Sequence, residues 1–575
     1  MNKILSLVIL LFSLPLMVVA GDAVPGGEQG YRIGDYRRGG ASSPKYEYRA
    51  VWLTTIENLD WPRTQVKTPA DIEKQKAELV VILDSLHAMH INTVLLQTRV
   101  RGDVIYPSSI EPFSHVLTGV SGKSPGYDPL AFAVEECHKR GIQLHAWLVT
   151  LPLGKVEHVK RLGTKALPKR NPSLCTRYKG AWYMEPGNPA TADYIAALVR
   201  EIVQNYDVDG IHLDYVRYPD RVDGYPDGSL FVKHGKRMSL ATWRRANITR
   251  IADSVYTAVK ELKPWVRVSC APLGKYNNLT RYSSLGWDAY NTVYQDAQGW
   301  LRDGVMDILF PMLYFDGNNF YPFVLDWCEN RHGRHVAPGL GIYRLMPEHG
   351  GWPQIEIERQ MRTSRSAAAD GITMFRTAHL VGNAGGARDI YTRIYDRPAL
   401  VPPMEWIADA PSTPSVTAAL RDERGVSLEW SAVSPADGFP AVRYNVYAAV
   451  GDTVDVGNID NLVATGMQCT AFRWDCRSVN DISMAVTAVD ACGVESEPAF
   501  ARCVAGSSMR CGDVVRLPHP QSWGQRISVK DVYGTEVYYG KFCRNFNVAG
   551  FAAGRYLLTV YDRHGALLYK VEFVR

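Results

Sequence analysis

Short apolar runs alternate with longer amphipathic stretches over the first 400 residues of the chain. Eight runs have the near-continuous apolar, β-rich character of buried strands: Arg49–Thr54, Asn92–Thr98, Gln143–Thr150, Gly210–Tyr215, Val266–Ala271, Asp307–Leu313, His335–Leu340 and Gly371–Phe375. Strands that are apolar on both faces are typical of parallel sheets covered by helices. The pattern therefore predicts an α/β fold built on a parallel sheet.

The stretches between these runs carry helix-capping signals. Thr68-Pro69-Ala70-Asp71 places a hydroxyl at the N-cap, a proline at the first helical position and an acid at the third. Asp128-Pro129 and Asn188-Pro189 repeat the cap-then-proline pattern, and a further helix is expected over 240–262. Eight strands that are each followed by a helix predict a (β/α)₈ (TIM) barrel over residues 48–400.

A doubly wound open sheet is the alternative to the barrel. That fold usually has fewer strands and often a glycine-rich nucleotide-binding turn. Neither GxGxxG nor GxxxxGK[ST] follows any of the eight runs. The barrel is therefore favoured.

The helical periodicity stops after Arg397, and a proline-rich linker leads into alternation of period two. Residues 412–505, with Trp430 in an early strand and a Tyr-x-Val-Tyr strand at 444–447, resemble a fibronectin type III sandwich. Residues 511–575 predict a second, small β-sandwich. This segment resembles the C-terminal sorting domains of an outer-membrane secretion system, and a stalk module without a sorting role is the alternative.

The N-terminus has the pattern of a secretory signal peptide. Lys3 precedes the apolar stretch Ile4–Val19, and the small residue Ala20 offers a cleavage point, so residues 1–20 are expected to be removed. Glycine-rich residues 21–47 predict a flexible leader. We expect a secreted, periplasmic or cell-envelope protein with no transmembrane segment after cleavage, and an uncleaved anchor is the alternative.

Composition narrows the class of protein. Hydrophobic residues make up 46% of the 575 positions and charged residues 21%, which excludes a mostly disordered chain. The net charge is only +5, and no run of five like charges occurs, so nucleic acid is not expected as a partner.

Cysteines and histidines give no sign of a metal or other cofactor. Six of the ten cysteines lie in the last 110 residues, where an exported protein can form disulfides, and none has zinc-site spacing. The pairs His87/His90 and His332/His335 are expected at the surface rather than as ligands. The sequence therefore predicts no cofactor.

Two aspartates are the leading candidates for catalysis, because barrel active sites lie at the C-terminal ends of the strands. Asp214 ends the fourth strand within Asp209–Pro219 and is expected to act as a nucleophile or base; a loop-capping role is the alternative. Asp103 follows the second strand beside two arginines that favour its ionised form, which suits a nucleophile or charge stabiliser. A static ion-pair lattice is its alternative.

A second carboxyl group is needed as the general acid for cleavage of a glycosidic bond. Glu185 is the first candidate, because its aromatic neighbours predict burial and a raised pKa. Asp316, after the sixth strand, is the second. A helix-capping role is the alternative for Glu185.

Cationic and aromatic side chains near the strand ends are expected to bind a sugar polymer, since flat apolar rings match the C–H faces of sugars. Trp52 and Trp147 lie inside strands and are expected in the core, as is His212. The expected substrate-binding residues are Trp61, Arg99, Arg101, Trp182, Arg217, Tyr218 and Tyr314.

Other hydrolase classes are disfavoured. Neither the GxSxG elbow of serine hydrolases nor the HExxH motif of zinc proteases occurs.

Four separate motifs together resemble one known family. In chain order they are Arg49-Ala50-Val51-Trp52-Leu53-Thr54-Thr55 with Trp61-Pro62, the Arg99/Asp103/Tyr106-Pro107-Ser108 stretch, Glu185-Pro186-Gly187-Asn188-Pro189, and Asp209 to Pro219. They look like the glycosyl hydrolase-like family 10 of exported bacterial proteins, once catalogued as domain of unknown function 187. The likeness covers residues 48–397.

This resemblance implies a (β/α)₈ barrel with glycoside hydrolase activity, and Asp103 and Asp214 in the active-site cleft. For some family members the substrate is peptidoglycan glycan stripped of its stem peptides. The family more often has an aspartate at the position of Glu185. No acid follows the fifth strand, so the acid pair of amylase-like barrels does not carry over.

Two functions remain open from the sequence. The first is an exported glycoside hydrolase that cleaves a polysaccharide, with peptidoglycan glycan strands lacking stem peptides as the expected substrate. The alternative is a non-catalytic glycan-binding or scaffolding protein of the cell envelope, which the missing acid after strand five favours.

Overall fold

The computed structural model describes residues 43–220, 222–235, 237–280, 287–421, 425–475, 482–503, 509–510, 514–517, 526–561, 565 and 567–575. The expected signal peptide and residues 21–42 of the expected leader lie outside these residues. Glu47, at the end of that leader, is buried, and its backbone N–H donates to Leu400 O (2.9 Å). Its carboxylate accepts from Arg365 Nε (2.7 Å). The last leader residues are thus bonded to the first large domain.

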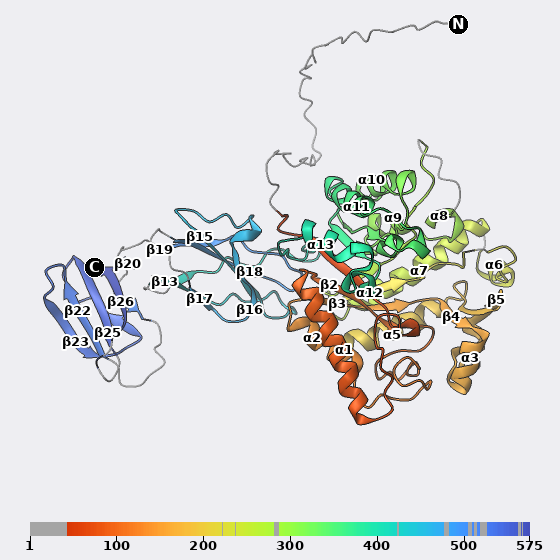
Figure 1. Cartoon of the computed structure of the whole chain (residues 1–575), viewed down its shortest axis with the longest axis horizontal. Coiled ribbons are helices and arrows are strands. Elements are labelled where there is room, and N and C mark those ends of the chain that lie inside the picture. Colours follow the sequence, from red (N-terminus) through yellow and green to blue (C-terminus); the bar gives the residue numbers. More distant parts are fainter. Residues whose placement is uncertain are drawn as a thin grey trace, which may run out of the picture. The chain divides into compact units, whose positions relative to one another are not determined.

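Parallel strands form the barrel that the eight apolar runs predicted (Figure 1). They are β1 (Tyr48–Leu53), β2 (Thr93–Arg99), β3 (Gln143–Val149), β7 (Gly210–Asp214), β8 (Arg267–Cys270), β9 (Ile308–Leu309), β10 (His335–Val336) with β11 (Gly339–Leu340), and β12 (Gly371–Met374). β10 pairs with β9, and β11 pairs with β12, with only Ala337-Pro338 between the two segments. They are therefore two halves of one seventh strand, and the pairing of β12 with β1 closes the ring.

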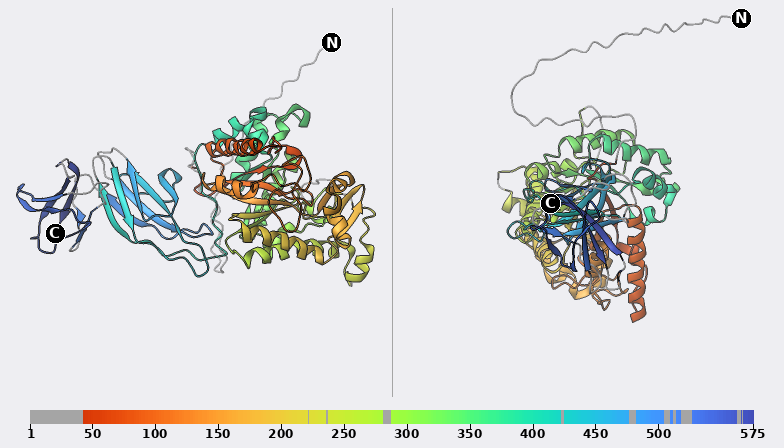
Figure 2. Two further views of the ribbon diagram at one scale, coloured as in Figure 1. Left: turned by 90° about the horizontal axis from the view of Figure 1, so that it is seen from below. Right: turned by 90° about the vertical axis from the view of Figure 1, so that its left-hand side faces the viewer.

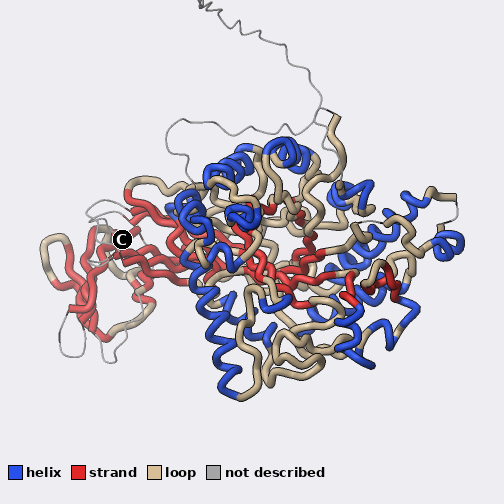
Figure 3. The backbone as a smooth tube through the Cα atoms, turned by 45° about the vertical axis from the view of Figure 1, so that its right-hand side comes forward, coloured by secondary structure: helices blue, strands red, loops and turns tan. Residues whose placement is uncertain are grey.

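Helices cover the outside of these strands (Figures 1 and 3). The longer ones are α1 (Pro69–Ala88), α2 (Pro129–His138), α5 (Ala190–Asn205), α7 (Leu240–Lys260), α10 (Tyr321–Glu329), α11 (Gln354–Ser366) and α13 (Ala387–Ile394); α6 (Gly228–His234), α8 (Ala289–Thr292), α9 (Ala297–Arg302) and α12 (Thr377–Val381) are shorter. Two of the three predicted caps are present, whereas α5 has Pro189 at its N-cap, with Asn188 Oδ1 accepting from Ala190 N (3.1 Å) just before it. Asp71 Oδ2 accepts from Thr68 N (2.9 Å), and Asp128 Oδ1 accepts from Leu130 N (3.1 Å), which satisfies amides that a helix N-terminus leaves free.

The long connection after β3 forms a small antiparallel sheet rather than an irregular loop. Its strands are β4 (Pro152–Lys155), β5 (Cys175–Tyr178) and β6 (Ala181–Met184), in the order β4-β6-β5, and it also carries α3 (Val156–Leu162) and α4 (Leu167–Arg170). This insertion places β6 side chains at the C-terminal face of the barrel, where the polypeptide leaves the parallel strands.

The barrel interior is packed with aromatic rings around His212. Trp52 Nε1 donates to His212 Nε2 (3.0 Å), and the Phe310 ring lies 5.5 Å from the imidazole. Because an indole N–H can only donate, Nε2 carries the lone pair and His212 Nδ1 donates to Ser269 Oγ (3.0 Å). Burial lowers the pKa of His212 to about 3. His212, Trp52 and Trp147 therefore lie in the core, as expected.

The remainder of the chain is all-β in its described residues (Figure 2). β13 (Val416–Arg421), β14 (Gly425–Trp430) and β17 (Ala471–Asp475) form one sheet, and β15 (Arg443–Val450), β16 (Leu462–Met467), β18 (Ile482–Val489) and β19 (Ala499–Cys503) form another. β20 (Met509–Arg510), β22 (Arg526–Asp531), β23 (Glu536–Lys541), β25 (Arg555–Tyr561) and β26 (Leu567–Val574) form a third, and β21 (Val514–Arg516) pairs with β24 (Asn545–Asn547).

Separate apolar cores underlie these sheets. One is centred on Trp430, Tyr444 and Val446, and the other on Ile527 and Phe573. The fibronectin type III likeness, the domain boundaries and the sorting role stay predictions. The disulfides expected in this part also stay a prediction, because Cys476 and Cys511 lie outside the described residues.

Two further predictions concern the exposure of His335 and the presence of a membrane-spanning helix. His335 was expected at the surface, and this was wrong: it is buried, and its Nδ1 lies 3.2 Å from the hydroxyl of Tyr48. The second concerns membranes. In the described ranges, no helix combines the length and apolar character that a bilayer crossing requires.

Candidate active site

Asp214 lies at the C-terminal end of β7, the end of the strands where barrel enzymes have their active sites. Its Oδ1 accepts from the backbone N–H of Tyr215 (2.7 Å), and its Oδ2 accepts from Trp147 Nε1 (3.2 Å). Only 6% of the residue is exposed. Burial raises the pKa of Asp214 to about 6, against the opposing effects of Arg217, these two donors and Arg101. A carboxyl group with this pKa can both donate and accept a proton near neutral pH.

Cationic and aromatic side chains surround this carboxyl group. Arg217 lies over the Tyr215 ring (4.5 Å from guanidinium carbon to centroid) and 5.8 Å from the Trp287 ring centroid. Tyr215 is 38% exposed and Trp287 is 42% exposed, so both offer ring surface to a ligand. Arg217 also forms an ion pair with Asp220, which keeps the guanidinium in place.

Two tyrosines from other loops complete this face. Burial raises the pKa of Tyr314 well above its usual value, and the negative charge of Asp214 raises it further. Tyr183 on β6 is half-buried, and Arg101 and Arg217 act on its pKa, which burial raises overall. The loops after β2, β3, β7 and β9 thus meet around Asp214.

Glu185 is buried, and burial raises its pKa as the sequence predicted. Both of its carboxylate oxygens are occupied, however. Thr176 Oγ1 donates to Oε2 (2.7 Å) and the Gly187 N–H donates to Oε1 (2.9 Å). The Glu185 carbonyl also accepts from Thr191 Oγ1 (2.7 Å) in α5. These contacts hold the carboxylate against β5 and the turn before α5, and no amide of α5, which the structure describes in full, donates to it. Its role as a proton donor stays a prediction.

The other two candidate acids differ in accessibility. Asp103 is fully buried, accepts from the Arg101 backbone N–H (3.1 Å), and lies with His115 and His158 in a cluster of possible metal ligands. Asp316 is exposed in the loop after β9. Asp214 is thus the only one of the four candidates that is buried at a strand end with cationic and aromatic groups around it.

The expected substrate-binding residues fall into two groups. Arg101, Trp182, Arg217 and Tyr314 are half-buried or adjoin Asp214. Three others are fully buried with their polar atoms engaged: Trp61 donates to Gln75 O (2.9 Å), Arg99 forms a bidentate ion pair with Glu111 (2.7 and 2.8 Å), and Tyr218 accepts from Asn247 Nδ2 (3.4 Å). These three side chains are thus enclosed by protein, and their role in binding substrate stays a prediction.

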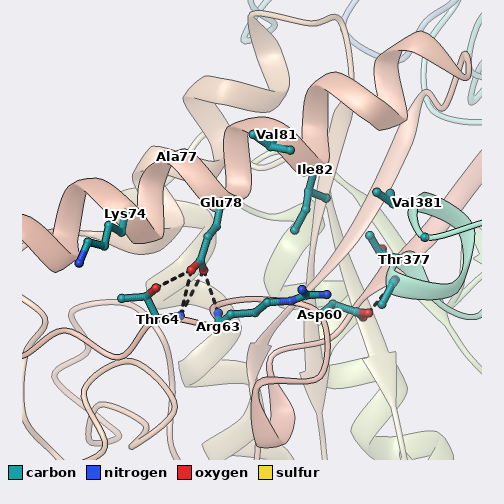
Figure 4. A pocket seen from close by; sticks show the side chains of 12 residues that line it. Asp60, Arg63, Thr64, Lys74, Ala77, Glu78, Val81, Ile82, Thr377 and Val381 are labelled. Atoms are coloured by element: carbon teal, nitrogen blue, oxygen red, sulfur yellow. Dashed lines mark hydrogen bonds between the residues drawn. The ribbon is translucent and has the colours of Figure 1, made fainter.

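A separate cavity of about 590 Å³ lies between α1 and α12 on the outside of the barrel (Figure 4). Asp60, Glu78, Val81 and Ile82 are among the residues that line it. Its carboxylates are already bonded: Thr64 Oγ1 donates to Glu78 (2.6 Å), and the Ala378 N–H donates to Asp60 (2.8 Å). None of the four candidate acids lines this cavity.

Sequence reasoning missed the roles of Trp147 and Tyr183. Trp147 was assigned to the core, and its ring does lie there, but its indole N–H reaches Asp214. The signal was the register of the two strands. Trp147 on β3 pairs with His212 on β7, and His212 lies two residues before Asp214, so the side chains of His212 and Asp214 are on the same inward face. Tyr183 lies in the long loop after the third strand, which the sequence places at the catalytic end of the barrel, but nothing in the sequence sets it apart from its neighbours Trp182 and Glu185.

Comparison with known proteins gives three kinds of match. Residues 47–344 match the family described as "Glycosyl hydrolase-like 10". The chain is 31% identical over 410 residues to glycosyl hydrolase YngK of Bacillus subtilis (67% of this chain, 79% of that protein), and 31% identical over 288 residues to glycosyl hydrolase DigH of Escherichia coli K12 (46% and 65%).

Among solved structures, the alpha-L-fucosidase isoenzyme 2 from Paenibacillus thiaminolyticus matches with a TM-score of 0.42 at 17% identity (64% of this chain, 52% of that one). The PgaB (BpsB) glycoside hydrolase domain from Bordetella bronchiseptica matches with a TM-score of 0.41 at 14% identity (60% and 98%).

Proposed function

The chain belongs to the glycosyl hydrolase-like 10 family, and from this premise we propose that it cleaves glycosidic bonds of a polysaccharide, with Asp214 as the proton-transferring group. The single observation that carries the proposal is the Asp214 carboxyl group at the C-terminal end of β7, with its pKa raised to about 6. Cleavage of a glycosidic bond requires a proton on the leaving oxygen, and a buried carboxyl group supplies it best when its pKa lies near the working pH.

The role of general acid thereby moves to Asp214 from Glu185, the candidate that the sequence favoured. Glu185 Oε2 accepts from Thr176 Oγ1 on β5, and Oε1 accepts from the Gly187 N–H in the turn before α5. Asp214 also accepts on both oxygens, from one backbone and one indole donor that fix the plane of its carboxyl group, but it lies at the C-terminal end of a barrel strand with Arg217 and Tyr215 beside it. Trp147 is a positioning residue in this scheme, because it orients the group that exchanges the proton.

Arg101 and Arg217 are the proposed binding residues for substrate charge, with Tyr215 and Trp287 as stacking surfaces. Peptidoglycan strands without stem peptides carry free carboxylates at regular intervals, and guanidinium groups pair with carboxylates in planar geometry. These strands are therefore the substrate we propose. Export to the periplasm or cell surface follows from the signal-peptide pattern of residues 1–20.

A non-catalytic glycan-binding role is the second candidate, and one observation favours it. Residues 269–274, at the end of β8, contain neither aspartate nor glutamate, whereas glycosidases commonly use a pair of carboxyl groups. If the protein only binds, glycan strands will associate with it without releasing shorter products.

The test combines binding and product analysis. Purified protein is incubated with peptidoglycan strands freed of stem peptides, and with plant and host glycans as comparison, and products are identified by mass spectrometry. Asp214→Asn is expected to lower kcat by about 10²–10⁴ while glycan binding persists. Asp253→Asn, at an exposed position on α7, is the matched control. Undiminished cleavage by Asp214→Asn would remove the mechanism, and binding without any product from the parent protein would favour the second candidate.

A further inference from the structure

A second polar cluster lies between the loop after β2 and helix α3. Asp103 and His115 come from this loop, and His158 comes from α3. One ligand atom from each side chain lies within 4.8 Å of the other two, and the two imidazole ring centroids are 6.0 Å apart. Two histidines and a carboxylate are a common ligand set for divalent transition metals.

Two buried atoms of this cluster lack a protein partner in the described part of the chain. Asp103 is 0% exposed, and while Oδ1 accepts from the Arg101 N–H, Oδ2 has no hydrogen bond. His158 Nε2 lies 3.7 Å from Oδ2, which is beyond hydrogen-bond distance. His115 Nδ1 is likewise buried without a partner. A buried carboxylate oxygen without a partner is costly, so a bound ion is a physical explanation for its retention.

The contacts of Arg161 determine which ring nitrogen of each histidine carries the proton. Its Nη1 is 3.3 Å from His115 Nε2, and its Nη2 is 3.5 Å from His158 Nδ1. A guanidinium can only donate, so both of these ring nitrogens carry lone pairs. The protons are therefore on His115 Nδ1 and on His158 Nε2, and His158 Nε2 donates to Arg101 O (3.1 Å). Both histidines are neutral in this arrangement, which is the state that binds metal.

We propose that Asp103, His115 and His158 bind a divalent transition metal ion, with zinc as the best match. Zinc bonds of about 2.0–2.2 Å in a tetrahedron place ligand atoms about 3.4 Å apart, so these side chains need to close by roughly 1 Å. The Arg101 carbonyl oxygen or a water completes the shell. The ion takes the place of the protons on His115 Nδ1 and His158 Nε2. Each neutral imidazole has a single ring proton, which moves through solvent to the other ring nitrogen, the one that faces Arg161, so no net proton is released.

Arg161 must then leave, because its N–H groups and the new imidazole N–H groups would face one another. Arg161 is exposed, so its side chain is free to turn toward solvent. The bound ion ties α3 to the loop that carries Arg101, the cation whose charge acts on Asp214. The site would thus fix one wall of the face around Asp214 without taking part in the reaction.

The experiment measures metal binding directly, so its result is independent of glycan cleavage. The protein is prepared without a histidine tag, stripped with EDTA, and titrated with ZnCl₂ by calorimetry and with CoCl₂ by visible absorption. We expect one equivalent of metal and the absorption of tetrahedral cobalt. His115→Ala and His158→Ala should each weaken binding on the order of 100-fold, since loss of even an outer partner costs 10–100-fold. His87→Ala, at an exposed position on α1, is the matched control.

Arg161→Gln gives a second, sharper readout. It removes the guanidinium that competes with the metal-bound tautomers, so zinc affinity should rise, and the protein should fold as the parent does because Arg161 is exposed. Far-UV circular dichroism of each stripped variant checks folding. Absence of stoichiometric metal binding by the parent, binding unchanged in the His115→Ala/His158→Ala double variant, or weaker binding by Arg161→Gln would each overturn the proposal.

Discussion

Replacing Asp214 by asparagine should change the free energy of unfolding more favourably at neutral pH than in acid. Asp214 has a pKa of about 6 in the folded chain and 3.8 as an ordinary carboxyl group. Between these values the folded state holds a proton that the unfolded state has lost, so stability falls as pH rises through this window. Asparagine carries no charge at any pH and does not show this loss.

The magnitude follows from the two pKa values. The buried carboxylate costs the parent about 3 kcal/mol at pH 7 and about 0.6 kcal/mol at pH 4. Asparagine leaves either the Tyr215 N–H or the Trp147 N–H without an acceptor, because it has one oxygen where aspartate has two. Asparagine does not titrate, so this offset is the same at both pH values. The free energy of unfolding of the Asp214→Asn variant, taken relative to that of the parent, should therefore be about 2.4 kcal/mol higher at pH 7 than at pH 4.

Urea denaturation followed by tryptophan fluorescence measures this difference, because ten of the fourteen tryptophans lie within residues 48–400. The two proteins are compared at pH 4 and pH 7 in the same ionic strength. Asp253→Asn, at an exposed position on α7, is the matched control. A gain below about 1 kcal/mol, or a gain of the opposite sign, would refute the assignment of a buried carboxyl group with a raised pKa.

Three further changes test the geometry around this group. Trp147→Phe removes the indole donor to the Asp214 carboxylate, so the pKa of Asp214 should rise further and the alkaline limb of the kcat/KM profile should move to higher pH; an unshifted limb would exclude the contact. Glu185→Gln should retain most of the activity on glycan strands, since Glu185 is a turn residue with both oxygens engaged, and a loss like that of Asp214→Asn would restore it as the acid. Glu111→Gln leaves Arg99 buried with a neutral partner and should lower the free energy of unfolding by about 3–5 kcal/mol in urea titrations, whereas a change below 1 kcal/mol would show that the pair is solvated.

The strands and helix starts of the barrel could be predicted from the sequence because their causes are local. A run of apolar residues buries wherever it folds, and the Thr68–Asp71 and Asp128-Pro129 caps satisfy amides within their own first turn. The position of Asp214 at a strand end follows from the same local pattern.

Contacts between distant segments could not be predicted in the same way. Trp61 and Tyr218 are aromatic residues near strand ends, which is the pattern expected of sugar-binding residues, yet both are fully buried. Their burial depends on which loop folds over each side chain. His335 looked like a surface histidine beside a glycine, and its burial against Tyr48 depends on closure of the barrel floor.

The sequence by itself determined the class of fold, the order of its strands and the acid at the end of the fourth, since each depends on residues that are near one another in the chain. Only the tertiary structure decided which groups meet: Trp147 with Asp214 across two strands, and Asp103 with His115 and His158 from a loop and an inserted helix. The pKa of a carboxyl group depends on burial and on charges within a few ångströms. Those distances are set by packing between segments that are far apart in sequence, so the chemistry of the site emerges only when the barrel closes.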